Sequence, residues 1–219
     1  MARVTLTFDN GPDRETTPVV LQTLERHRVL ATFFVVGDRM LDPLERLNAE
    51  AAHAAGHWIG NHSMTHTIPL GEDPRPDAVK REIVEAQNVI GSLTHPDKFF
   101  RPFGGGGYLD RRLLNPAARD YLVREGFTCV LWNVVPRDWE DSEGWPRRAL
   151  EACAVNSEIL LVLHDGLREA MKNLDRFVRQ LKDEGHAIVQ DFPASCVPIR
   201  GGRVLLNTST FINDARFQS

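Results

Sequence analysis

The sequence predicts an α/β protein in which a parallel β-sheet is covered by helices and closed, or nearly closed, into a barrel. Short apolar runs alternate with amphipathic segments along the 219 residues, and repeated strand–helix units are typical of parallel sheets. The run 159–163 (ILLVL) is apolar throughout, as expected of a buried strand. Several apolar runs end in polar residues, which is where such barrels place their chemistry. A chain of this length is expected to form one domain.

The local pattern assigns the elements in order. The first strand, 4–8, alternates apolar residues and stops at the turn-forming sequence DNGP. Further apolar runs predict strands at 31–36, 58–60, 99–100, 127–132, 159–163 and 187–189. Apolar residues at helical spacing predict helices at 17–27, 43–55, 77–93, 116–125, 146–153 and 167–185. The clearest helix is 77–93, with Val79, Ile83, Ala86 and Ile90 on one stripe.

The C-terminal part departs from this rhythm. We therefore divide the chain into an α/β domain, 1–193, and a C-terminal extension, 194–219. The run RVLLNTSTFI in the extension predicts either an added strand or a segment that crosses to a partner. The sequence does not decide the oligomeric state.

Charge and composition exclude several classes of protein. The net charge of −4 opposes general binding to nucleic acid, and no apolar run is long enough for a transmembrane helix. The cysteines Cys129, Cys153 and Cys196 are widely spaced without a CxxC motif, which disfavours a disulfide framework. Because strand-like sequence begins at Arg3, no signal peptide is predicted. We expect a cytoplasmic location, or an extracytoplasmic one if a leader has been removed.

Side chains that can ionise or bind metal follow five of the predicted strands. They are Asp9 and Asn10, His62 and His66, Arg101, Asp138 with Trp139, and His164 with Asp165. Because the C-terminal ends of parallel strands meet at one face of a barrel, we expect these side chains to form one site.

The stretch NHSMTH contains the sharpest pair, His62 and His66. If it opens a helix, the four-residue spacing places both imidazoles on one face, about 5–6 Å apart at Cβ, which suits two bonds of about 2.0–2.1 Å to one divalent ion. Two surface or capping histidines would have the same spacing, so the motif alone leaves both interpretations open. An oxygen from the end of the first strand would complete three protein ligands, the arrangement of catalytic sites.

Each remaining candidate has a catalytic and a structural interpretation. Asp9 suits a general base beside metal-activated water, or a turn former. His164 is either a core histidine or an acid that Asp138 orients. Arg101 either lowers the pKa of Asp9 or forms a surface salt bridge. The glycines 104–107 allow flexibility or a close approach to substrate, and no Lys-Ser/Thr follows them as in a phosphate loop.

Five stretches, in this order, resemble the motifs of the polysaccharide deacetylases, which are carbohydrate esterase family 4 or the NodB homology domain. TFDNGP is similar to the family's TFDDGP, GHWIGNHSMTH to GHEIGNHT-x-x-H, FFRPFGG to the arginine-containing third motif, WNVVPRDW to W-S-x-D-x-x-D-W, and LLVLHD to the final histidine motif. Each motif alone is weak, but all five in order are specific, and they cover the chain from Val4 to about Val189. The resemblance implies a distorted (β/α) barrel of the NodB type and a metal-dependent hydrolase that removes N-acetyl groups from glycans containing N-acetylglucosamine.

The resemblance also implies a role for each matching residue. Asp9 would be the general base, tuned by Arg101, and His164 would be the general acid, tuned by Asp138. The metal ligands would be Asn10, His62 and His66, and the ion zinc, with cobalt or nickel as alternatives. The substrate-binding residues would be Trp139, Val162, Gly104 and Gly105.

Three residues depart from the family pattern. Asn10 stands where the family has a metal-binding aspartate, and its neutral amide predicts weaker metal binding or an Asp9 drawn toward the ion. Gly104 stands where an aromatic residue usually contributes a backbone amide to the oxyanion, and Val135 replaces an aspartate of the fourth motif.

Two alternatives to a glycan deacetylase stay open. The absence of a predicted export signal suggests a small amide, such as a formamide or ureide, or an amino-sugar intermediate as substrate. Asn10 suggests instead a catalytically weak or silent relative that binds a glycan. Retention of Asp9, His62, His66, Asp138 and His164 argues against the silent relative.

Overall fold

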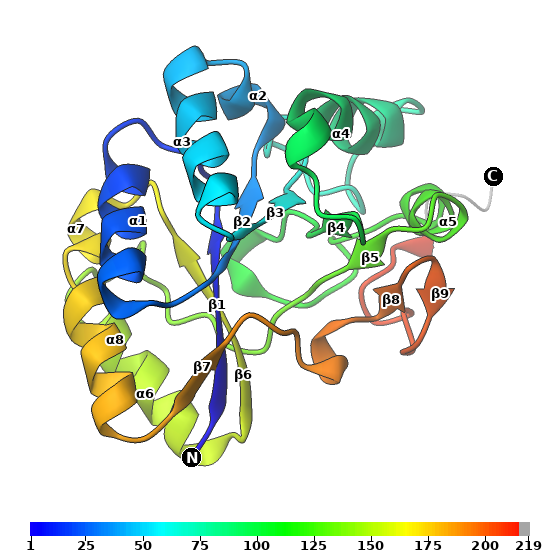
Figure 1. The fold of residues 1–219 in the computed structure, drawn as a ribbon. Coiled ribbons are helices and arrows are strands. Elements are labelled where there is room, and N and C mark those ends of the chain that lie inside the picture. The colour runs from blue at the N-terminus through cyan, green and yellow to red at the C-terminus, as the bar shows by residue number, and fades with distance from the viewer. Residues whose placement is uncertain (215–219) are drawn as a thin grey trace.

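The computed structural model describes residues 1–214 and confirms the α/β prediction (Figure 1). Its strands are β1 (Arg3–Asp9), β2 (Thr32–Val35), β3 (Trp58–Asn61), β4 (Phe99–Phe100), β5 (Thr128–Cys129), β6 (Glu158–His164), β7 (Ala187–Val189), β8 (Ile199–Arg200) and β9 (Arg203–Val204). They form one sheet in the order β6-β1-β2-β3-β4-β5-β8-β9, with β7 also paired to β1. Pairing is parallel from β6 to β5 and antiparallel in β5–β8 and β8–β9.

The sheet curls toward closure through the chain that follows β5. Val134 lies beside β6, where its N–H donates to the Leu160 carbonyl at 3.2 Å and its carbonyl accepts from the Val162 N–H at 3.0 Å. Earlier in the same segment, the Leu131 N–H donates to the Cys196 carbonyl. The predicted strand 127–132 is therefore wrong in length, because the Val130 N–H still donates to Phe100 of β4 but the backbone changes partners from Leu131 onward. The result is the distorted, nearly closed barrel that was predicted.

Helices cover the outside of the sheet (Figure 1). They are α1 (Thr16–His27), α2 (Gly37–Met40), α3 (Pro43–Ala54), α4 (Glu85–Ile90), α5 (Pro116–Arg124), α6 (Trp145–Val155), α7 (Arg168–Met171) and α8 (Leu174–Asp183). The predicted helix 77–93 contains a π-helical segment, η1 (Lys80–Val84), before α4 and a 3-10 turn, η2 (Gly91–Leu93), after it. The single helix predicted at 167–185 is wrong: two helices, α7 and α8, occupy it. Asn173, between them, donates from Nδ2 to the Ser142 carbonyl at 2.9 Å.

Side chains on the two faces of β1 lie in different parts of the molecule. In β1, Val4, Leu6 and Phe8 join the core that packs against the helices, whereas Thr7 and Asp9 are buried on the barrel side. This follows from the alternation of side chains along a strand. Because β1 and β6 are parallel and in register, Asp9 lies directly beside His164.

The C-terminal extension joins the same sheet. Its strands β8 and β9 form an antiparallel hairpin on β5, and Ile212 bridges to Leu114. The last part of the predicted extension, 215–219, lies outside the described residues. Among residues 1–214, none of the helices combines the length and the apolar character needed to span a membrane.

Candidate active site

A cavity of about 300 Å³ opens where β1, β3 and β6 end. Most of the predicted site residues line it: Asp9, Asn10, His62, His66, Gly104, Trp139, Val162 and His164. Arg101 and Asp138 are buried and contact Asp9 and His164 from behind. Gly105 is not one of the lining residues. The face predicted to carry the chemistry therefore brings these polar side chains into one place.

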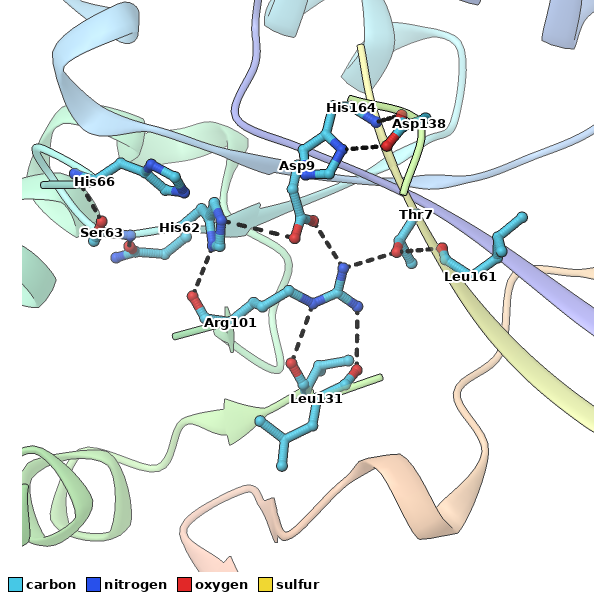
Figure 2. Close-up of polar contacts among 12 residues, drawn as sticks. Thr7, Asp9, His62, Ser63, His66, Arg101, Leu131, Asp138, Leu161 and His164 are labelled. Carbon is cyan, nitrogen blue, oxygen red and sulfur yellow. Dashed lines mark hydrogen bonds and ion pairs between the residues drawn. The ribbon is translucent and has the colours of Figure 1, made fainter. Parts of the chain in front are cut away.

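Arg101 is wholly buried and fixes Asp9 (Figure 2). Its Nη1 donates to Asp9 Oδ1 at 2.7 Å and to Thr7 Oγ1 at 2.7 Å. Its other nitrogens donate to the carbonyls of Val130 and Leu131. The alternative of a surface salt bridge is wrong, because this ion pair lies inside the barrel, where water does not screen it. Only Oδ2 of Asp9 remains directed at the imidazoles.

His164 is held by Asp138 in a fixed orientation (Figure 2). Its Nδ1 lies 2.7 Å from Asp138 Oδ1, and its backbone N–H donates to Oδ2 at 2.9 Å. Since the carboxylate holds Nδ1, Nε2 is left for the cavity. Burial opposes protonation of His164, but the hydrogen bond and charge of Asp138, with a smaller contribution from Asp9, outweigh it and raise the pKa of the imidazole.

His62 and His66 lie side by side, with ring centroids 4.9 Å apart. The helix expected over NHSMTH is wrong, because Ser63 (φ 67°) and His66 (φ 53°) adopt left-handed backbone conformations. An irregular loop, and not one face of a helix, brings the two imidazoles together.

The environment of the two imidazoles keeps them neutral. A carbonyl oxygen only accepts hydrogen bonds, so the 2.9 Å contact with the Arg101 carbonyl makes His62 Nδ1 the donor. The lone pair of His62 is then on Nε2, which lies 3.7 Å from Asp9 Oδ2. Burial lowers the pKa of His62, and burial together with the neighbouring His62 lowers the pKa of His66 to about 3. Neutral imidazoles with a held Nδ1–H are the form in which histidine binds metal.

Asn10 provides the test of whether a metal ion fits. It has a left-handed backbone (φ 71°), lines the same cavity, and its buried Oδ1 has no hydrogen-bond partner. Leaving a buried oxygen unpaired costs about 1–3 kcal/mol, which a cation at this position would offset. Within residues 1–214, no three His, Cys, Asp or Glu side chains form a metal-binding group. The third donor available here is an amide oxygen, and with it the residues fit a divalent ion.

The glycine-rich loop packs against the protein itself. A Cβ on Gly104 would lie 2.7 Å from Leu113 Cδ2 and 2.9 Å from Trp132 Cη2. Gly107 has φ 76°, and a Cβ there would lie 2.9 Å from Val135 Cγ1. Val135, which departs from the family motif, thus forms the wall against which this loop is seated. Close packing accounts for both glycines, and at Gly107 the left-handed backbone is a second reason.

Two residues that shape the site, Phe103 and Thr7, were not predicted from the sequence. The ring of Phe103 lies 3.9 Å from that of His66, and Thr7 contacts Arg101. Thr7 could have been found, because it lies two residues before Asp9 on the same face of β1. Asp165, named only for its position after the strand, is fully buried and accepts the hydroxyl of Thr17.

Comparisons with known proteins identify a family and several relatives. A family model described as polysaccharide deacetylase matches residues 2–123. A peptidoglycan-N-acetylglucosamine deacetylase of Bacillus cereus is 31% identical over 196 residues, which is 86% of this chain and 66% of that protein. A chitooligosaccharide deacetylase of Sinorhizobium fredii is 34% identical and covers 74% of this chain and 72% of that protein. The chain spans 37% of the deacetylase PgdA of Listeria monocytogenes, at 30% identity over 85% of this chain.

Solved structures show the same fold. The peptidoglycan deacetylase PdaC of Bacillus subtilis superimposes with a TM-score of 0.71, at 27% identity over 86% of this chain and 87% of that one. A family 4 acetyl xylan esterase of Clostridium thermocellum, in complex with a cobalt ion, gives 0.69 at 27% identity, over 85% of this chain and 86% of that one. Thus a structure similar to this chain contains a cobalt ion.

Proposed function

The chain belongs to the polysaccharide deacetylase family, and we propose that it is a metal-dependent hydrolase that removes N-acetyl groups from glycans containing N-acetylglucosamine. The observation that carries the proposal is the placement of Asp9 beside His164, with two neutral imidazoles in the same cavity. The relatives named as peptidoglycan and chitooligosaccharide deacetylases support the substrate class.

We assign the metal site to His62, His66 and the Oδ1 of Asn10, and zinc is the ion we propose. Support comes from the neutral imidazoles and from the unpartnered amide oxygen. When bound, the ion would polarise the acetyl carbonyl and lower the pKa of a water molecule. Two histidines and one oxygen leave a position for substrate or water.

Asp9 is the proposed general base. Its Oδ1 is held by Arg101, so the proton of the attacking water goes to Oδ2, which faces the imidazoles. The ion pair prevents the carboxylate from rotating, and a fixed base is what proton transfer in a confined site needs.

His164 is the proposed general acid. Asp138 holds Nδ1, so the proton is delivered from Nε2 to the departing amine. The raised pKa of His164 favours the protonated imidazole, which is the form that a general acid requires. Acetate and a free amino sugar leave. Asp9 has then gained one proton from the attacking water, and His164 has given one proton to the amine.

The apolar wall near His164 suits the acetyl methyl group. Val162 precedes His164 by two residues and therefore lies on the same face of β6. The Trp139 ring meets the His164 ring edge-on, with centroids 5.2 Å apart. We propose that these side chains bind the methyl group, and Gly104 lines the same cavity.

One observation favours a second candidate, a catalytically weak relative that binds glycans. Asn10 brings no negative charge to the metal site, so the ion would be held less strongly than by a carboxylate. The base and the acid are both in place, and for this reason we prefer the enzyme.

Acetate release from N-acetylchitooligosaccharides with added zinc tests the proposal. We expect turnover by the wild type and none by Asp9→Ala or His164→Ala, with both variants folded. Turnover by Asn10→Asp, with none by the wild type, would favour the silent relative. Cleavage of formamides or ureides, without release of acetate from glycans, would show that the substrate is a small amide.

A further inference from the structure

The loop that carries the two imidazoles is held from behind by a carboxylate that the proposed chemistry does not use. Glu82 lies in η1 and is 1% exposed. Its Oε2 accepts the backbone N–H of Thr65 at 2.9 Å, and its Oε1 accepts the Thr65 hydroxyl at 2.9 Å. Thr65 immediately precedes His66, so Glu82 is one residue away from a proposed metal ligand.

The loop needs such support because its backbone is strained. Ser63 and His66 have positive φ values. Each non-glycine residue in this region costs about 1–3 kcal/mol, so the conformation persists only where its surroundings impose it. The start of α2 fixes the near side of the loop, where the N–H groups of Gly37 and Asp38 donate to the carbonyls of Ser63 and Met64 at 2.9 and 2.8 Å. These bonds fix Ser63 and Met64, and the His66 N–H donates to Ser63 Oγ at 3.2 Å. Thr65, between Met64 and His66, is held from the other side of the loop.

The π-helical segment η1 holds the loop at both ends. The backbone carbonyl of Ile83 accepts a hydrogen bond from Asn61 Nδ2 at 3.0 Å. Asn61 Oδ1 in turn accepts one from the Ser63 N–H at 3.0 Å. The next residue back, Glu82, holds Thr65. π-helical turns are rare, and they are frequent at functional sites. In η1, two consecutive residues hold the same loop of the proposed site, which gives the turn a structural role there.

A carboxylate suits this position better than an amide. Both groups that Thr65 presents to Glu82 are donors, and Arg75 Nη2 adds a third at 3.2 Å from Oε1. A glutamine would have to direct its own NH₂ at one of these donors. Arg75, which also binds Asp73, balances the buried charge of Glu82.

We infer that Glu82 is a positioning residue for the metal site: through Thr65 it holds the strained loop so that the imidazole of His66 faces that of His62. This inference rests on the proposed function, since it assumes that His66 binds the ion. Glu82 itself does not reach the cavity, so its effect is on the formation of the site and not on the chemistry.

The test is the zinc affinity of the full chain, measured by competition with a chromogenic chelator. We expect Glu82→Gln to weaken zinc binding roughly 10–100-fold, as is usual when the partner behind a metal ligand is changed, while turnover at saturating zinc stays close to that of the wild type. Asp73→Asn is the matched control, because Asp73 is a second buried carboxylate bound by Arg75. Its zinc affinity should be unchanged.

A milder pair of variants keeps the test decisive if Glu82→Gln does not fold. Thr65→Val removes the hydroxyl that Glu82 accepts and should weaken zinc binding, whereas Thr65→Ser retains the hydroxyl and should restore it. Wild-type affinity in both Glu82→Gln and Thr65→Val would overturn the inference and leave the proposed function standing. A wild type that binds no zinc would instead overturn both.

Discussion

Asp165 offers a prediction whose magnitude follows from its surroundings. Its side chain is fully buried between the end of β6 and the loop after β1, and it occupies the space that a Cβ on Gly11 would need. Oδ2 accepts the Thr17 hydroxyl, whereas Oδ1 has no partner. Burial disfavours the charged form and raises the pKa of Asp165 from 3.8 to about 6.

The raised pKa makes the stability of the protein depend on pH. The folded chain holds this proton more tightly than the unfolded chain, so the stabilisation is fully present below about pH 4 and is lost as the pH rises through about 6. The shift is about 2 pH units, and each unit corresponds to about 1.4 kcal/mol. Asp165 therefore contributes about 3 kcal/mol at low pH that is absent above about pH 7.

The variant Asp165→Asn isolates this contribution, because asparagine does not titrate. We expect the free energy of unfolding of the wild type, relative to the variant, to fall by about 3 kcal/mol between about pH 4 and pH 8. Urea unfolding at a series of pH values measures it, and groups that titrate alike in both proteins cancel in the difference. A difference that is constant with pH would refute the reasoning, whatever its absolute size.

Three further predictions concern the site itself. Asp138→Asn removes the charge that raises the pKa of His164, so the alkaline limb of the pH profile of kcat/KM should move to lower pH; an unmoved limb would contradict the assignment of the acid. Thr7→Val leaves Arg101 without one buried partner and should lower the free energy of urea unfolding by about 1–3 kcal/mol, and equal stability would show that the hydroxyl is dispensable. Asn10→Asp adds a carboxylate oxygen and should tighten zinc binding in calorimetry; weaker binding would place the ion elsewhere.

The alternation of side chains explains why much of the site could be predicted from the sequence. In β1 and β6 a period of two separates the core-facing residues from Thr7, Asp9 and His164. In parallel strands of matching length, the last residues come to one edge, and the register confirms that Asp9 and His164 do so. No knowledge of the loops is needed for this part of the prediction.

The sequence could not predict how the loops are shaped. The spacing of His62 and His66 suggested a helix, but the loop depends on Glu82, which is sixteen positions beyond His66 in the chain. The complete burial of Arg101 could not be predicted either, because its partners come from β1 and from the chain after β5. Such conformations are fixed by contacts distant in sequence, and a local pattern carries no information about them.

The charge of the site gives Asn10 a consequence beyond weaker metal binding. Asp9 is paired with Arg101 and Asp138 with His164, while His62 and His66 are neutral. These side chains therefore have nearly no net charge with which to balance a divalent ion, and an aspartate at position 10 would have supplied one negative charge. A neutral ligand lowers the affinity for the ion but leaves more of its charge to act on the acetyl carbonyl. Tighter zinc binding by Asn10→Asp need not bring faster turnover, so affinity and kcat have to be measured separately in that variant.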